Sequence, residues 1–183
     1  MTFDKLMLHY SYIQILVAAI VLVAAATDLR SRRIPNWLTL SGVCAGLLMN
    51  YFISGLPGIR TSLSGMLLGF GAYFVLYCLR AMGAGDVKLM AAVGAIVGPA
   101  NWVAVFIATA VAGGVLAVAL MIWKGRVKET LGNTLFIFGE LLQFRAPHKK
   151  HSHLDVKDPR ALNMPHGVAI AAGTVACLLL AVI

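Results

Sequence analysis

Long apolar runs separated by short polar segments make up most of the chain. The first run without a charged residue extends from Leu6 to Thr27, and runs over 37–53 and 61–79 follow at short intervals. Runs of about 18 or more apolar residues have the length of a transmembrane helix. The apolar residues are continuous rather than alternating, which favours helices over barrel strands. The pattern therefore predicts an all-α, polytopic membrane protein.

A further uncharged stretch, Leu89 to Trp123, is too long for one span. Gly98-Pro99-Ala100-Asn101 interrupts it, and Gly and Pro mark helix breaks. We expect a short helix over 87–97 and a full-length helix over 102–123. The short helix would rise only about 17 Å, less than a hydrocarbon core of about 30 Å. The segment before it is therefore expected to dip into the membrane boundary.

Residues 124–164 form a polar connector before a last helix over 167–183. Apolar residues recur at helical spacing in its first half, which indicates an amphipathic helix lying on the bilayer or against the bundle. They are Val127, Leu131, Leu135, Phe138 and Leu142. The second half is charged, contains histidines and is expected to be a loop. The predicted architecture is one membrane-embedded domain, 1–183, with a bundle of about six transmembrane helices.

The charge distribution supports this layout and orients it. Charged residues make up 12% of the chain, whereas soluble domains carry about 25%, and the mean hydropathy is +0.87. The segments 28–36, 80–88 and 124–164 hold 13 of the 15 Lys and Arg residues. Under six crossings these segments share one side, which the positive-inside rule makes cytoplasmic, with both termini outside. Topology thus accounts for the net charge of +8, and no nucleic-acid partner is expected.

Two of the seven acidic residues, Asp28 and Asp86, fall at predicted helix ends on that same side. Ionisable groups in or near a span are costly and point to function. Two carboxylates at hydrogen-bond distance do not readily both ionise, so they share a proton. One can then deprotonate a water while the other polarises a peptide carbonyl. This chemistry requires no cofactor and no metal.

Neighbouring residues have supporting roles or structural explanations. Gly83 and Gly85 flank Asp86, where they permit positive φ and leave room for an extended substrate. Lys88 could tune the pair, contact the substrate or simply be a topogenic charge. Pro35 and Asn36 are expected to form the turn that presents Asp28. The alternative is structural: Asp86 as a helix N-cap and Asp28 as a polar stop.

No metal site is predicted. The three cysteines are Cys44, Cys78 and Cys177; all lie in apolar runs, and they form no CxxC pair. The histidines 148, 151 and 153 are expected to lie in a solvated loop.

The motifs resemble those of the type IV prepilin peptidases, the GxGD membrane aspartyl proteases. The matching stretches are Thr27-Asp28-Leu29-Arg30, Arg33-Ile34-Pro35-Asn36 and Gly83-Ala84-Gly85-Asp86-Val87-Lys88-Leu89. Met164-Pro165-His166-Gly167-Val168-Ala169-Ile170 is similar to the family's Pro-Tyr-Gly-x-Ala-Ile stretch, with His166 in place of the usual aromatic residue.

The resemblance implies that Asp28 and Asp86 are the catalytic pair. It implies a prepilin substrate, with a basic leader and an apolar helix, cut at the cytoplasmic face of the bacterial inner membrane. Pro165, His166 and Gly167 become a candidate substrate-facing segment. Longer members carry a CxxC-containing insert and also methylate the new N-terminus. This chain has neither insert nor CxxC and resembles the short peptidases of tight-adherence (Flp-type) pili, so no methylation is expected.

Two other functions remain open at this point, as does assembly into a homo-oligomer. A small proton-coupled transporter would use the two aspartates as a relay at mid-membrane depth. It would also show inverted repeats, which the sequence lacks. A non-catalytic scaffold of a pilus or secretion machine would use them only as helix caps.

Overall fold

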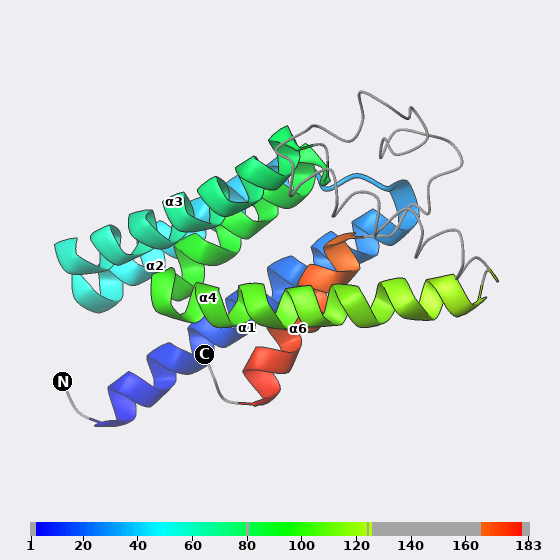
Figure 1. Ribbon diagram of the computed structural model, residues 1–183. Helices are drawn as coiled ribbons and strands as arrows, with labels where there is room; N and C mark the ends of the chain where they lie inside the picture. Colours follow the sequence, from blue (N-terminus) through cyan, green and yellow to red (C-terminus); the bar gives the residue numbers. More distant parts are fainter. Residues whose placement is uncertain (1–2, 80, 124, 126–165, 181–183) are drawn as a thin grey trace.

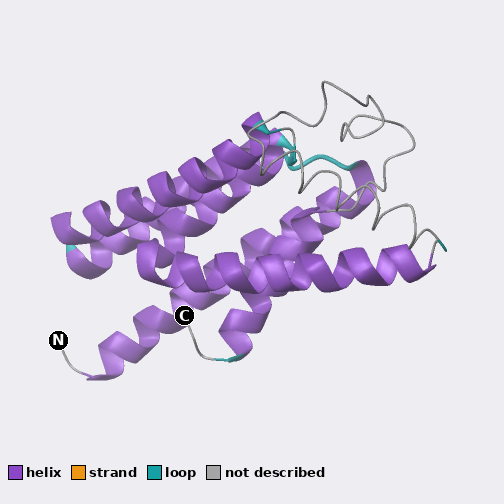
Figure 2. Cartoon of the chain, viewed as in Figure 1, coloured by secondary structure: helices purple, strands orange, loops and turns teal. Residues whose placement is uncertain are grey.

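Five helices form the described part of the chain in the computed structural model, which describes residues 3–79, 81–123, 125 and 166–180 (Figures 1 and 2). They are α1 (Phe3–Ser31), α2 (Asn36–Ser54), α3 (Leu56–Cys78), α4 (Ala84–Trp123) and α6 (His166–Leu179). No strand occurs within these ranges, so they confirm the predicted all-α class. The predicted connector helix and Pro165 lie outside the described residues.

Four of these helices, α1 to α4, are long and apolar enough to cross a membrane, and α6 is a shorter apolar helix. The chain is therefore a multi-pass membrane protein. The predicted count of six spans is not reached within the described residues: the segments 87–97 and 102–123 both fall in α4, which counts as one of the four candidate spans although it is kinked at Gly98.

The turn between α2 and α3 is tight. Only Gly55, with φ of 65°, separates the two helices. Pro57 is accommodated in the first turn of α3, where no intrahelical N–H donor is required. Gly58 is buried so close to α2 that an added Cβ would overlap the Asn50 carbonyl oxygen.

The predicted break in α4 is confirmed at Gly98, where φ is 79° and ψ is 172°. Pro99 has no N–H group, so the helix cannot supply its usual donor to the carbonyl of Ala95. Asn50 replaces this lost donor: its Nδ2 lies 3.2 Å from the Ala95 oxygen and 3.1 Å from the Ile96 oxygen. Ser62 Oγ also donates to Ala95. Polar side chains from α2 and α3 thus cap the first part of α4.

Glycines bring α2 and α3 close to the first part of α4. A Cβ on Gly65 would lie 2.1 Å from the Gly94 oxygen, and one on Gly69 would lie 2.4 Å from the Met90 oxygen. A Cβ on Gly46 would meet the Ala95 backbone at 2.8 Å. Gly65 and Gly69, four residues apart on α3, therefore allow a close approach of α3 to α4.

The second part of α4 changes direction and packs with α6, which also packs against α1 (Figure 1). Thr109 and Gly173 mark the contact between α4 and α6, since a Cβ on Gly173 would lie 2.4 Å from the Thr109 nitrogen. The ends of α1 and α3 and the beginnings of α2, α4 and α6 gather at one end of the bundle (Figure 1). That end contains both predicted aspartates.

Candidate active site

Asp28 lies in the last turn of α1 and is buried, with 8% of its surface exposed. The backbone N–H of Gly167 donates to its Oδ2 at 2.9 Å. Gly167 stands in the first turn of α6, where N–H groups have no intrahelical acceptor and the helix dipole favours a negative charge. A Cβ on Gly167 would lie 3.0 Å from both Cβ and Oδ2 of Asp28. The absent side chain allows this contact.

The segment after Asp28 turns sharply into α2. Arg32 adopts φ of 53°, and its N–H donates to the Asp28 carbonyl at 2.9 Å, which ends α1. Pro35 then has extended backbone angles and is the N-cap residue of α2, which begins at Asn36. The connection between the two helices contains Pro35, but Asn36, which was predicted to belong to the turn, is already helical, and α1 extends past Asp28 to Ser31.

Asp86 is the third residue of α4, because the helix begins at Ala84 rather than near residue 87 as predicted. Its Oδ2 accepts the Gly83 N–H at 3.2 Å. A carboxylate in the first turn that reaches back to the preceding N–H resembles one half of a capping box. Asp86 therefore stabilises the N-terminus of α4 from a position within the first turn and is not the N-cap residue.

The two glycines beside Asp86 do not have positive φ, contrary to expectation, since the positive-φ glycines among the described residues are Gly55, Gly98 and Gly125. Their lack of a side chain instead allows other segments to lie close to the start of α4. A Cβ on Gly85 would lie 3.2 Å from Cβ of Ile34, so the start of α4 lies against the segment that follows Asp28.

Lys88 links the two aspartate-bearing segments directly. Its Nζ donates to Oδ1 of Asn36 at 2.9 Å. Asn36 follows the turn after Asp28, and Lys88 follows Asp86 by two residues. The contact thus joins the beginnings of α2 and α4.

A largely apolar pocket of about 390 Å³ adjoins this contact. It lies between α2, α3 and α4 and is lined by Asn36, Thr39, Leu40, Val43, Phe70, Lys88 and Ala91. Its polar groups are concentrated near the beginnings of α2 and α4. An apolar segment could therefore lie in it with one end close to Asp86.

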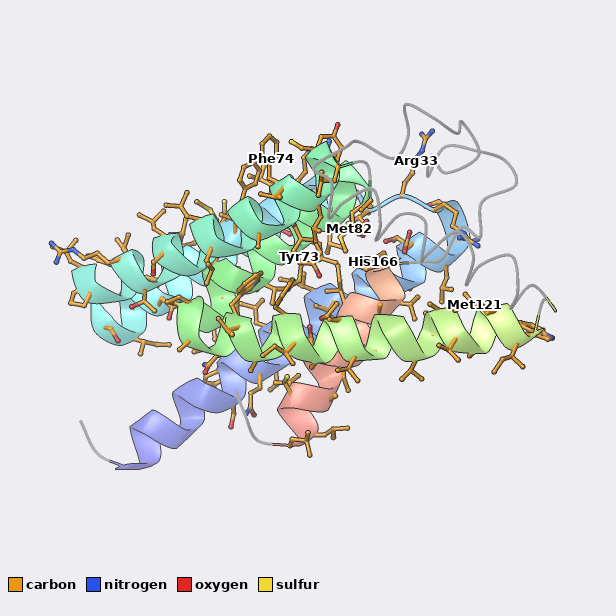
Figure 3. The ribbon with its side chains drawn as sticks, in the orientation of Figure 1. Arg33, Tyr73, Phe74, Met82, Met121 and His166 are labelled. Atoms are coloured by element: carbon orange, nitrogen blue, oxygen red, sulfur yellow. The ribbon has the colours of Figure 1, made fainter. Side chains whose placement is uncertain are left out.

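Asp28, Asp86, Tyr73 and His166 are titratable groups at this end of the bundle. The negative charge of Asp28 acts on Asp86 and on His166, and that of Asp86 acts on Tyr73. The rings of Tyr73 and His166 lie 6.2 Å apart, and Figure 3 shows them facing the same region. The structure thus places Asp28 and Asp86 at the same end of the bundle, and their sharing of a proton stays a prediction.

Tyr73 is the residue that sequence reasoning missed. It is only 1% exposed and lies on the face of α3 that also carries Gly65 and Gly69. Its spacing of four residues from Gly69 was the available signal, but nothing in the sequence separated it from the other aromatic residues of α3.

No group of three or more His, Cys, Asp or Glu side chains in the described ranges could hold a metal ion. Cys44 and Cys78 are exposed free thiols and Cys177 is a buried one. The predicted His-containing loop lies outside these ranges.

Comparison with known proteins gave one match. The model of the type IV leader peptidase family matches residues 15–118, a segment that contains both aspartates and the links between them. Searches of curated proteins and of solved structures found no match.

Proposed function

The chain belongs to the type IV leader peptidase family, and we propose that it removes the leader of type IV (Flp-like) prepilins by aspartyl proteolysis. The observation that carries the proposal is the convergence of Asp28 and Asp86 at one end of the bundle. Each carboxylate accepts a backbone N–H, from Gly167 and from Gly83 respectively. Both side chains are therefore oriented before a substrate arrives.

The proposed reaction uses the two carboxylates in complementary states. One carboxylate takes a proton from a water as the water oxygen attacks the scissile carbonyl carbon. The other, protonated, gives its proton to the carbonyl oxygen. Collapse of the tetrahedral intermediate breaks the C–N bond. The nitrogen receives the proton that the first carboxylate took from the water, and the second carboxylate takes a proton back from the intermediate, which restores the pair. The products are a free leader carboxyl group and a pilin with a new N-terminus.

The proposed topology has six crossings, with the two parts of α4 counted separately, and both termini outside. The aspartates then face the cytoplasm, beside the basic segments 28–36 and 80–88. A prepilin whose apolar helix lies in the membrane would present the junction with its leader at this depth. The chain contains no CxxC pair, so we propose that the new N-terminus is left unmethylated.

A cleavage assay in membranes with a prepilin substrate tests this function. Asp28→Asn and Asp86→Asn each remove one ionisable oxygen while preserving shape, and each is expected to reduce cleavage by about 10³-fold or more. Asp158→Asn, in the charged connector, is the matched control and should cleave at the wild-type rate. The intact mass of the product reports whether a methyl group has been added.

Cleavage by both single Asn variants at the wild-type rate would refute the proteolytic function. It would favour the hypothesis of a non-catalytic scaffold, in which the aspartates only cap helices.

A further inference from the structure

His166 has a nitrogen that the fold leaves unused. Its Nε2 is buried, yet it has no hydrogen-bond partner among the described residues. A buried polar nitrogen without a partner destabilises the folded state. Nε1 of Trp102 and Oγ1 of Thr109 are also buried without a partner in the described part of the chain, but of these three residues His166 is the one adjacent to the residue that binds Asp28. A bound group that completes its hydrogen bond during function would explain this nitrogen.

The position of His166 specifies where that group would lie. The next residue, Gly167, holds Asp28 through its N–H at 2.9 Å, and the charge of Asp28 acts on the imidazole. The ring lies 6.2 Å from the ring of Tyr73 on α3, with the two planes tilted by 51°. The imidazole therefore stands next to the residue that binds Asp28 and close to Tyr73 of α3 (Figure 3).

Packing explains why residue 166 has a flat ring, but it does not explain why that ring carries a nitrogen at Nε2. Tyr73 also packs edge-to-face with Phe106 at 6.0 Å, and Phe106 stacks on Trp102 at 5.2 Å. His166 extends this aromatic row toward the site, and a phenylalanine ring would do so equally well. An imidazole adds a hydrogen-bonding atom to a flat ring of similar width.

We propose that Nε2 of His166 makes a hydrogen bond to the main chain of the bound substrate at the peptide that is cut. This assignment rests on the proposed function and adds a third polar side chain to the two aspartates. The substrate it implies is an extended peptide, since a main-chain group must reach the space between α3 and α6. His166 is thus a catalytic residue in the sense of touching the substrate, without itself taking part in water activation.

The test compares His166→Phe with His166→Gln in a reconstituted cleavage assay, with kcat, KM and the thermal midpoint measured for each. Phe keeps the ring and removes the nitrogen, whereas the amide of Gln places a nitrogen near the position of Nε2. We expect His166→Phe to lower kcat/KM by about tenfold or more without lowering the thermal midpoint. His166→Gln should keep kcat/KM within about threefold of wild type.

Phe106→Leu is the matched control, because it disturbs the same aromatic row without removing a polar atom. It should lower the thermal midpoint and leave kcat/KM within about threefold of wild type. If His166→Phe cleaves as fast as wild type, the ring serves packing alone and the inference is wrong. If the wild-type protein cleaves no prepilin, the proposed function fails and this inference fails with it, which is a distinct outcome.

Discussion

Asp28 is oriented by a backbone N–H rather than by another side chain. The donor belongs to Gly167, 139 positions further along the chain. Because the glycine lacks a Cβ, α6 can approach to hydrogen-bonding distance of the carboxylate. The geometry of Asp28 thus depends on a backbone N–H that every substitution at Gly167 except proline keeps, but that an added Cβ would displace.

Gly167→Ala is therefore expected to impair activity more than stability. The new Cβ would lie 3.0 Å from Oδ2 of Asp28, so the carboxylate or α6 must shift by a few tenths of an ångström. We expect cleavage to fall by about tenfold or more, since small displacements of a reacting group are costly. The measurement is kcat/KM in membranes, alongside the thermal midpoint.

Gly114→Ala provides the matched control, because a Cβ there meets nothing within 4 Å. It should cleave at the wild-type rate. Equal activity of Gly167→Ala and Gly114→Ala would show that the contact between Gly167 and Asp28 is dispensable.

At the scale of elements, the beginnings of α2 and α4 are joined by one side-chain contact. Lys88 Nζ lies 2.9 Å from Asn36 Oδ1, and Gly85 packs toward Ile34 on the same side. The sequence left Lys88 with three roles: tuning the pair, binding substrate or orienting the protein. The contact with Asn36 favours a fourth, which is positioning the start of α4 against the turn after Asp28.

Lys88→Met and Asn36→Ala should then each lower kcat/KM by about three- to tenfold. This loss corresponds to about 1 kcal/mol, the contribution expected of one exposed hydrogen bond to a charged group. The double variant should be no worse than the more impaired single variant, because both changes remove the same contact. Arg60→Met, which removes an exposed charge from α3, is the control. Additive losses in the double variant would mean that Lys88 and Asn36 act separately.

At the scale of the whole molecule, the bundle relies on backbone-to-backbone contact as well as on apolar side chains. Gly65 and Gly94 approach so closely that a Cβ on either would lie 2.1 Å from the other's carbonyl oxygen. Such spacing allows helices to pack tightly where lipid provides no hydrophobic driving force. The polar contacts of Asn50 and Ser62 lie beside this region, at the break in α4.

Gly65→Ala is expected to destabilise the fold by about 1–3 kcal/mol, because α3 and α4 must separate to admit one methyl group. Thermal unfolding in detergent measures the loss. Gly71→Ala, on the same helix but with nothing within 4 Å of its Cβ, should be neutral or slightly stabilising. A midpoint for Gly65→Ala equal to that of Gly71→Ala would contradict the close packing.

The sequence predicted the helices, the break at Gly98 and the gathering of Asp28 and Asp86 at one end, because these follow from hydrophobic length, Gly-Pro chemistry and charge bias. Helix boundaries were less accurate: α3 begins at Leu56 and α4 at Ala84, since Pro57 and Gly85 are tolerated in a first helical turn. The contacts of Asp28 with Gly167 and of Tyr73 with His166 join residues far apart in the chain. No local pattern encodes such pairings, so only the structure shows them.

The groups that anchor the two aspartates belong to different sets of helices. Asp86 is tied to α2 through Lys88 near its start and again through Asn50 near the break in α4, whereas Asp28 is tied to α6. The distance between the carboxylates therefore depends on the tilt of α1 and α6 relative to α2, α3 and the first part of α4. Helix tilt responds to hydrocarbon thickness, so we expect the spacing of these two carboxylates to depend on the thickness of the lipid bilayer.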